Sequence, residues 1–288
     1  MKKQKVWFIT GASRGFGFEI AKAALRAGDK VVATVRKNAE QVATALGAGN
    51  DLLVVVLDVT NKQQVEEGVR KALATFGRID ILVNNAGYGF LGAFEEATDE
   101  DILRQYNTNV FGLLHVTRAL LPHMRQAQSG HIINFSSLFG YKASAPGFGI
   151  YASTKFAVEG ISEGLAAEVK PLGIHVTSVA PGVFATDFLA NDSYIVSQNS
   201  IDAYASTVGQ LKELALQLHG NQPGDPARLA QVVIALGNSS NPPVHLPVGK
   251  DAIAAFREKM AETEAEVKAW EEISASTDLQ QTASANAS

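Results

Sequence analysis

The sequence predicts an α/β fold, a single doubly wound parallel sheet of about seven strands with helices on both faces. Seven short runs rich in apolar, β-branched residues recur along the chain, and most gaps between them leave room for a helix and a crossover connection. Several runs are continuously apolar, which is typical of strands covered on both faces. The predicted strands are residues 5–10, 30–35, 52–57, 79–83, 130–135, 174–179 and 244–246.

Apolar residues at helical spacing fill the gaps between these runs. One stripe follows the first strand at residues 21–25, and another follows the third at residues 65–76. Thr98 and Asp101 have the spacing of a capping box that begins a helix running through Leu114. Pro171 and Gly173 end a helix that runs through residues 160–169.

The domain organisation predicted from these signals is simple. Strand signals continue almost to residue 250, so residues 1–273 are expected to form one domain. Residues 188–225 mix polar and aromatic residues, and we expect an insertion of short helices that forms a lid over the substrate. A last helix is predicted through Trp270, and residues 274–288 contain little that could be buried, so a disordered tail is expected there.

Composition excludes several classes of function. The 288 residues carry 25 Lys plus Arg against 29 Asp plus Glu, and a net charge of −4 argues against a nucleic-acid partner. The absence of cysteine excludes disulfides and thiol catalysis, and the scattered histidines indicate no metal site. No apolar run approaches the ~18 residues of a membrane span, and the N-terminal apolar stretch is too short for a signal peptide. A cytoplasmic protein without membrane partners is therefore expected.

A glycine-rich turn follows the first predicted strand and leads into the first helix. Gly11 permits a tight turn, while Gly15 and Gly17 let the backbone approach a pyrophosphate and let the helix pack on the sheet. The helix N-terminus adds amide donors and a partial positive charge. Glycine also serves turns with no ligand. The position after the first strand favours a Rossmann-like dinucleotide site, and the spacing excludes a P-loop.

Four further motifs occur in order along the chain. They are Asn84-Asn85-Ala86-Gly87 after the fourth strand, Ser137 after the fifth, Tyr151-Ala152-Ser153-Thr154-Lys155, and Pro181-Gly182 after the sixth. With the glycine-rich turn, residues 5–250 resemble the short-chain dehydrogenase/reductase family. The resemblance implies hydride transfer between a nicotinamide cofactor and an alcohol/carbonyl pair.

Tyr151 and Lys155 make chemical sense as a pair. At i and i+4 they lie on one face of a helix, about 6 Å apart along its axis. An ammonium beside a phenol favours the phenolate and is expected to lower the phenol pKa from about 10 toward the working pH of a general acid. An isolated pair of this spacing is usually an exposed Tyr beside a solvated Lys. The accompanying motifs favour the catalytic interpretation.

Family resemblance adds two catalytic residues. It implies that Ser137 polarises the substrate carbonyl, with Ser136 ending the strand beside it, and that Asn109 supports a proton relay to Lys155. Asn107 stands two residues earlier and is the alternative to Asn109. The predicted catalytic set is thus Asn109, Ser137, Tyr151 and Lys155.

The same resemblance implies the cofactor contacts. Asp58 is expected to meet the adenine amino group, although a carboxylate at a strand end can also simply cap the turn. Residues 85–87 line a sugar, Lys155 holds the nicotinamide ribose, and the loop after Pro181 fixes the carboxamide. The predicted cofactor-binding residues are Gly11, Ser13, Arg14, Gly15, Phe16, Gly17, Arg36, Asp58, Val59, Asn85, Ala86, Gly87, Tyr151, Lys155, Pro181, Gly182, Val183 and Thr186.

The end of the second strand predicts the cofactor. NAD-preferring folds usually place an acidic residue there to bind both ribose hydroxyls, but this position holds Val35. Arg36 and Arg14 are expected to converge on a 2′-phosphate, which favours NADP(H) over NAD(H). The alternative is that Arg14 caps the turn and Arg36 is solvated.

The predicted activity is NADP(H)-dependent reduction or oxidation of a neutral, fairly apolar carbonyl/alcohol substrate. A non-catalytic NADP(H) sensor or scaffold is the alternative, although a sensor does not need all four catalytic residues. A helix over 151–169 with several apolar faces predicts a homodimer or homotetramer. Nine apolar residues are expected either to line the pocket or to pack the lid: Phe90, Leu91, Phe94, Phe139, Phe148, Phe184, Phe188, Leu189 and Tyr194.

Overall fold

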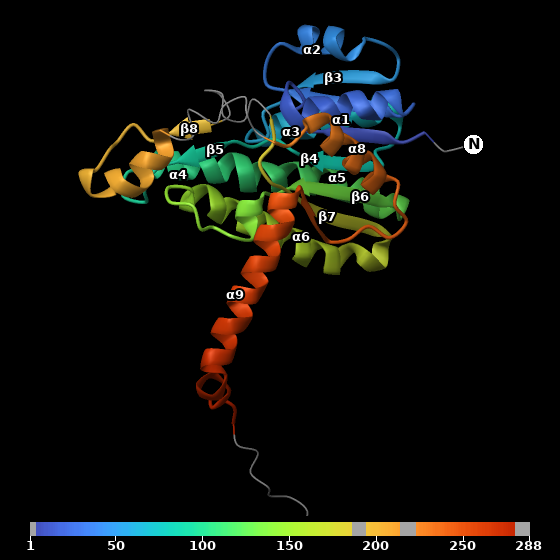
Figure 1. Cartoon of the computed structure of the whole chain (residues 1–288). Coiled ribbons are helices and arrows are strands. Elements are labelled where there is room, and N and C mark those ends of the chain that lie inside the picture. The colour runs from blue at the N-terminus through green and yellow to red at the C-terminus, as the bar shows by residue number, and fades with distance from the viewer. Residues whose placement is uncertain (1–3, 186–193, 214–222, 280–288) are drawn as a thin grey trace, which may run out of the picture.

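The computed structural model describes residues 4–185, 194–213 and 223–279. Its centre is a parallel sheet of seven strands in the order β3-β2-β1-β4-β6-β7-β9, so the predicted fold class is confirmed (Figure 1). The chain forms β1 in the middle of the sheet, adds β2 and β3 on one side of it, and then adds β4 and the later strands on the other side. Open α/β sheets bind ligands at this switch point between β1 and β4. The strands are β1 Val6–Ile9, β2 Lys30–Val35, β3 Leu52–Val56, β4 Ile81–Asn84, β6 Gly130–Phe135, β7 Ile174–Pro181 and β9 His245–Val248.

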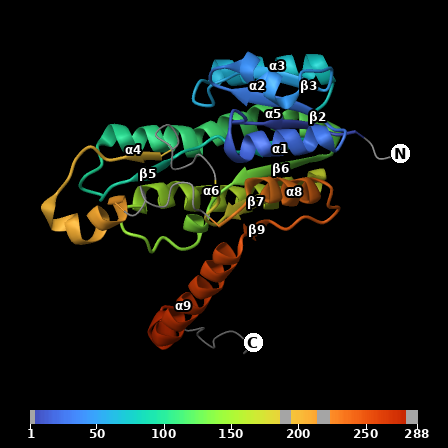
Figure 2. The same ribbon diagram turned by 45° about the horizontal axis from the view of Figure 1, so that its top comes forward.

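Helices cover both faces of this sheet, which explains why the strands are continuously apolar (Figure 2). In β1, Trp7 and Ile9 join one core cluster while Val6 and Phe8 join the other. The first face is covered by α1 Gly15–Arg26, α2 Ala39–Leu46 and α8 Pro226–Gly237. The second face is covered by α3 Lys62–Phe76, α5 Leu113–Ala127 and α6 Gly149–Val169. As expected, Gly173 has a positive φ of 70° after the short helix η3 Lys170–Leu172.

The helix predicted to begin at Thr98 is interrupted. Its capping box is present, because the Thr98 hydroxyl accepts from the Asp101 amide at 3.1 Å and the Asp101 carboxylate accepts from the Thr98 amide at 3.3 Å. Helix α4 Asp99–Tyr106 then passes into a π-helical segment, η1 Asn107–Gly112, before α5 begins. The π-helical segment sits at the carboxyl edge of the sheet and carries both candidate asparagines.

The insertion at 188–225 differs from the prediction of short helices alone. Its first described residues form β8 Tyr194–Val196, which pairs in parallel with β5 Gly89–Leu91 to make a separate two-stranded sheet. Three-residue strands are too short to show a period in the sequence. The short helices η5 Asp202–Tyr204 and η6 Ala205–Gly209 follow.

Glu96 anchors this insertion to the body, although carboxylates at 95–96 would ordinarily be solvated. Its side chain is buried and accepts hydrogen bonds from the amides of Ala93 and Ile201 and from Lys212 Nζ, at 3.0, 3.1 and 2.9 Å. Burial acts to raise the pKa of this carboxyl, but the hydrogen bonds outweigh it and the pKa is lowered. Glu96 is therefore an internal ion-pair partner of the lid.

Helix α9 Lys250–Ala275 leaves the body and forms a projecting arm (Figures 1 and 2). It extends past Trp270 and past the expected domain boundary at 273, and residues 276–279 follow it with exposed side chains. The rest of the predicted tail, 280–288, lies outside the described residues. Among the described helices, none is both long and apolar enough to cross a membrane.

Candidate active site

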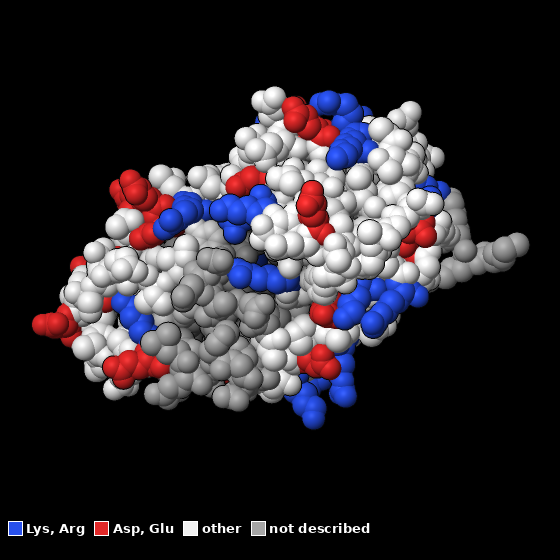
Figure 3. Space-filling view, turned by 90° about the horizontal axis from the view of Figure 1, so that it is seen from above, with Lys and Arg blue, Asp and Glu red and all other residues white. Residues whose placement is uncertain are grey.

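A cleft of about 1870 Å³ opens at the carboxyl ends of the parallel strands. Lys and Arg side chains gather near the middle of the face shown in Figure 3. Of the predicted site residues, the cleft is bordered by Gly11, Ser13, Arg14, Gly15, Phe16, Arg36, Asp58, Val59, Asn85, Ala86, Gly87, Ser137, Tyr151, Lys155, Pro181, Gly182 and Val183. Gly17 and Asn109 lie behind this lining, and Thr186 lies outside the described residues.

The glycine-rich turn is held tightly against the start of α1. Gly11 and Gly15 have positive φ angles of 67° and 55°, which favour glycine. A Cβ on Gly17 would lie 2.5 Å from the Gly11 carbonyl oxygen and 2.6 Å from Asn85 Nδ2, so any side chain there would push the turn outward. Helix α1 begins at Gly15, which borders the cleft and has no side chain. A ligand in the cleft can therefore approach the first amide groups of the helix closely.

Asn85 ties the turn to the end of β4. Its Nδ2 donates to the carbonyl oxygens of Thr10 and Gly11 at 2.9 and 3.1 Å. The Thr10 hydroxyl in turn accepts from the amides of Asn85 and Ala86 at 2.9 and 3.0 Å. The side chains of Asn85 and Thr10 thus hold the glycine-rich turn against the end of β4. Between them, Gly11, Ala86 and Gly87 border the cleft with small side chains or none. This surface fits an extended phosphate-bearing ligand.

At the other end of the cleft lie the residues expected to distinguish the cofactors. Val35 is buried at the end of β2, and the exposed Arg36 follows it in the cleft wall. Asp58 Oδ1 accepts from the amide and hydroxyl of Thr60 at 2.9 and 2.7 Å, so this carboxylate does cap the turn after β3 while also bordering the cleft.

Helix α6 carries Tyr151 and Lys155 at the floor of the cleft, and both side chains are buried. Lys155 Nζ donates to the Phe135 carbonyl at 2.8 Å and lies 5.7 Å from the centre of the Tyr151 ring. The prediction that the pKa of Tyr151 is lowered is wrong. Burial raises this pKa to about 12, and a hydrogen bond between Ser137 and Tyr151 only partly opposes the rise. Burial likewise lowers the pKa of Lys155 to about 8, against the opposing charge of Glu159.

Ser137 and Asn109 complete the group around these two residues. Ser137 caps the short helix η2 Leu138–Gly140, and its hydroxyl accepts from the Phe139 amide at 3.2 Å. Asn109 is buried and its Nδ2 donates to the Tyr88 carbonyl and the Thr154 hydroxyl at 3.0 and 3.1 Å. A Cβ built on Gly87 would lie 3.1 Å from Asn109 Oδ1 and 3.7 Å from Lys155 Nζ, so both approach the same backbone.

The two alternative residues lie elsewhere. Asn107 is exposed and borders the outer cleft beside α4. Ser136 donates from its hydroxyl to the Lys155 carbonyl at 3.2 Å and so fastens β6 to α6.

A buried polar cluster beneath the floor was not foreseen from the sequence. Glu159, one turn after Lys155, accepts from Ser178 Oγ at 2.7 Å and from the Tyr141 hydroxyl at 2.9 Å, and its carboxylate lies 3.1 Å from His245 Nδ1. These partners come from β7, from the loop after Ser137 and from β9. Glu159 thus joins three elements of the site. A four-residue spacing from a catalytic Lys was the only signal for it.

The loop after β7 is held by a second unforeseen carboxylate. Asp251, at the start of α9, accepts from the Val183 amide at 2.6 Å and packs so closely on Gly182 that no Cβ would fit there. The Phe184 ring meets Phe16 edge-on at 5.4 Å between centroids. Helix α4 also contributes Leu103 and Arg104 to the cleft wall. Helical periodicity predicted the helix but not that these two residues border the cleft.

The nine apolar residues separate into distinct groups. Phe139, Phe148 and Phe184 border the cleft, and the rings of Phe139 and Phe148 stack at 4.7 Å. Phe90 and Leu91 are fully buried, while Phe94 is 70% exposed. Tyr194 is buried, and the centre of its ring lies 6.0 Å from the centre of the Phe148 ring. Phe188 and Leu189 lie outside the described residues.

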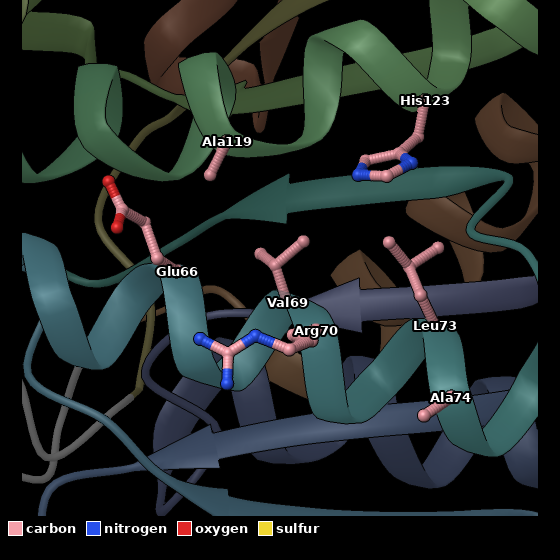
Figure 4. A pocket seen from close by; sticks show the side chains of 7 residues that line it. All are labelled: Glu66, Val69, Arg70, Leu73, Ala74, Ala119 and His123. Atoms are coloured by element: carbon pink, nitrogen blue, oxygen red, sulfur yellow. The ribbon is translucent and has the colours of Figure 1, made fainter.

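A second concavity of about 420 Å³ lies between α3 and α5, away from the cleft. Figure 4 shows its floor of Val69, Leu73 and Ala119 between the two helices, with Glu66 and His123 at the rim. It shares no lining residue with the cleft. In the described part of the chain, no group of His, Asp and Glu side chains has the arrangement of a metal site.

Known proteins share both the sequence pattern and this geometry. Residues 5–194 match the profile of the family described as short chain dehydrogenase. The chain belongs to the short-chain dehydrogenase family. The oxidoreductase BOA17 of Botryotinia fuckeliana is 39% identical over 272 residues, which cover 94% of this chain and 98% of that protein. A 3-ketodihydrosphingosine reductase of Bacteroides thetaiotaomicron is 38% identical over 246 residues, 85% of this chain and 88% of the other.

Solved structures agree with this membership. A short-chain dehydrogenase from Streptomyces avermitilis superposes with a TM-score of 0.87 at 39% identity, covering 96% of this chain and all of the other. A 3-ketoacyl-(acyl-carrier-protein) reductase from Brucella melitensis, solved with NADH, is 30% identical with a TM-score of 0.70, covering 85% and 96%. ElxO, solved with NADP, is 28% identical with a TM-score of 0.72, covering 88% and 100%. This short-chain dehydrogenase is therefore an NAD(P)-dependent oxidoreductase acting on CH–OH/C=O groups.

Proposed function

We propose that this short-chain dehydrogenase is an NADP(H)-dependent carbonyl reductase for neutral, apolar substrates. One observation carries the proposed chemistry: Tyr151, hydrogen-bonded to Ser137, lies buried beside the ammonium of Lys155 on the floor of the cleft. A non-catalytic sensor of the same fold would not need a buried acid, a buried cation and a hydroxyl at one point.

Each of these side chains has a role in the proposed reaction. A bound nicotinamide supplies or accepts the hydride. Tyr151 donates its phenolic proton to the carbonyl oxygen during reduction, and Ser137 donates a hydrogen bond to the same oxygen. Lys155 stabilises the phenolate that forms, because a cation nearby favours the charged state of a buried phenol. Asn109 holds the main chain of Tyr88 through both atoms of its side-chain amide, and its proposed role is to support a proton relay to Lys155.

The NADP preference rests on the end of β2. The buried Val35 leaves no carboxylate there to repel a 2′-phosphate, and the Arg36 guanidinium borders the cleft. Arg14 borders the same cleft from the glycine-rich turn. A charge-assisted contact contributes about 1.5–3 kcal/mol, so NADPH should exceed NADH in kcat/KM by about 10- to 150-fold per contact.

The preference is tested by steady-state kinetics with both cofactors. Arg36→Ala should lower kcat/KM for NADPH by about 10-fold or more and leave NADH nearly unchanged. Arg26→Ala is the matched control, since this exposed arginine at the end of α1 does not border the cleft. Equal kcat/KM values for both cofactors in the wild type would refute the NADP assignment.

The substrate class is inferred from the cleft beyond Tyr151. Its walls there include Leu138, Phe139, Ala145, Phe148 and Ile195, which suit an apolar group next to the carbonyl. The relative from Bacteroides thetaiotaomicron is named a 3-ketodihydrosphingosine reductase, which supports a ketone as the substrate. A panel of ketones, aldehydes, steroids, retinoids and long-chain 3-keto compounds should show turnover that rises with apolar area. Preference for carbonyl compounds that bear a carboxylate or a phosphate would contradict it.

Assembly and compartment remain proposals from the sequence. Exposed Phe111 and Phe156 on η1 and α6 are consistent with pairing of these helices in a homodimer or homotetramer. Light scattering that gives one chain mass at micromolar concentration would refute this. A cytoplasmic location is tested by fractionation of the source cells.

A further inference from the structure

The arm formed by α9 is fastened to the body only along its first half. Ala252 is buried, the Phe256 ring meets the Tyr141 ring at 4.9 Å and 90°, and Lys142 Nζ pairs with Glu258 and Glu262 at 3.0 and 2.7 Å. From Met260 to the end of the helix every residue is exposed. Within the described residues, the last ion pair between the arm and the body is at Glu262, and the helix continues from there to Ala275 (Figure 1).

Large apolar side chains continue along this exposed part of the helix. Met260, Val267, Trp270 and Ile273 are 59%, 55%, 63% and 63% exposed, and Ile253 nearer the base is 39% exposed. Isolated exposed apolar residues are normal on a protein surface, but four of these five, all except Ile273, lie along one side of the helix. Together with the half-buried Phe256, which also contacts Tyr141, and with Thr263, these four form the series Ile253, Phe256, Met260, Thr263, Val267 and Trp270, in which steps of three and four residues alternate. These are the a and d positions of a two-helix coiled coil.

We propose that the exposed stripe of α9 binds α9 of a second copy of this chain, with the two helices antiparallel. In an antiparallel pair, a positions face d positions of the second copy. With Met260 opposite Thr263, the same register places Phe256 opposite Val267 and Ile253 opposite Trp270. Each apolar a or d residue except Met260 thus gains an apolar neighbour, and the arm tip of one copy reaches the base of the other.

The charged residues beside the stripe choose this orientation. In an antiparallel pair, residues at e face e and residues at g face g. This register places Arg257 opposite Glu264 and Lys259 opposite Glu266, and the two-fold symmetry repeats each pair. In a parallel pair, Lys259 would face Glu264 but Glu266 would face Glu271, so an attractive contact is offset by a like-charge contact, whereas both pairs named above are attractive in the antiparallel register. The charge pattern therefore matches a second, oppositely directed copy of the same helix.

This surface is separate from the α5 and α6 surface discussed above, and it does not depend on the proposed activity. If α5 and α6 also pair, loss of the arm contact should lower the assembly from four chains to two. If they do not, it should lower the assembly from two chains to one. Either result supports the arm contact, because both remove one step of association.

The test is sedimentation velocity of the full chain at several micromolar concentrations, with charge-reversal variants. Lys259→Glu should weaken association about 10-fold, because two attractive pairs become repulsive. The double variant Lys259→Glu/Glu266→Lys should restore it to within about threefold of the wild type, since the pairs are attractive again in the antiparallel register. Glu272→Lys is the matched control and should leave association unchanged, because this residue lies on the opposite face of the helix.

Substitution of the apolar stripe provides an independent measurement. The double variant Val267→Glu/Trp270→Glu should abolish association through α9 at all the micromolar concentrations measured. Both side chains are exposed, so the substitutions should not impair folding. Circular dichroism and NADPH turnover check that each variant is folded. A mass unchanged by the stripe variant, or a wild type with one chain mass throughout, would overturn the proposal. Failure of the double charge swap to restore association would overturn the antiparallel register.

Discussion

Replacing Glu159 by Gln is expected to move the alkaline limit of carbonyl reduction to lower pH. Lys155 must carry its proton to stabilise the Tyr151 phenolate, and its pKa is lowered to about 8 by burial. The Glu159 carboxylate, one helical turn away, opposes that shift. Gln keeps the size and an accepting oxygen for Ser178 or Tyr141, but it removes the negative charge.

The magnitude follows from the helix geometry. Groups at i and i+4 are about 6 Å apart, and at an effective dielectric constant of about 20 the attraction is roughly 3 kcal/mol, an upper limit equal to about 2 pKa units. The longer reach of the side chains reduces this, so we expect a shift of about 1–2 units. Activity of the wild type should fall above about pH 8, and activity of the variant should fall about 1–2 units earlier.

The assay is kcat for ketone reduction at saturating NADPH, measured from pH 5.5 to pH 10. The midpoint is independent of the amount of folded enzyme, so partial loss of stability does not affect it. Tyr141→Phe is the control, because it removes one hydrogen bond to Glu159 but leaves the charge. An unchanged midpoint in Glu159→Gln, or an equal shift in both variants, would refute the electrostatic reasoning.

Three other predictions test separate parts of the structure. Tyr151→Phe should lower kcat by at least ~10³-fold with nearly unchanged cofactor affinity, and a variant keeping a tenth of wild-type kcat would exclude Tyr151 as the proton donor. Gly17→Ala should weaken cofactor binding about 10-fold or more, measured by fluorescence titration, because its Cβ meets Gly11 and Asn85; Gly160→Ala, with open space around it, should not. Glu96→Ala should lower the free energy of unfolding by about 2–4 kcal/mol in urea, since buried donors and Lys212 lose their acceptor, and a loss below about 0.5 kcal/mol would contradict that role.

The sequence was sufficient for the sheet because each central strand is covered on both faces. In the continuous apolar run of β1, Trp7 and Phe8 pack on opposite faces of the sheet. Such a run is typical of a strand buried on both faces, and it can be recognised from neighbouring residues alone. The small sheet of β5 and β8 has no such signal, because each strand has three residues and its partner is about a hundred positions away. Pairing at that distance depends on tertiary packing.

For the site, motif spacing located the groups but not their environment. The charge of Lys155 was expected to dominate the pKa of Tyr151 and to lower it, whereas burial dominates the pKa values of both residues. Glu159 and Glu96 have the same residue type as the solvated carboxylates of α9, and only the fold distinguishes them by burying them. A single sequence cannot predict which carboxylate lies inside.

The π-helical segment between α4 and α5 has a consequence for how this helix can vary. One extra residue within a helix rotates everything after it by about 100°. The side of α4 that borders the cleft and the side of α5 that packs on the sheet are therefore set independently. Insertion or deletion of one residue between 110 and 112 would turn the cleft wall on α4, together with Asn109, relative to a fixed core. Length changes at this point offer a route to altered ligand preference that leaves the sheet untouched.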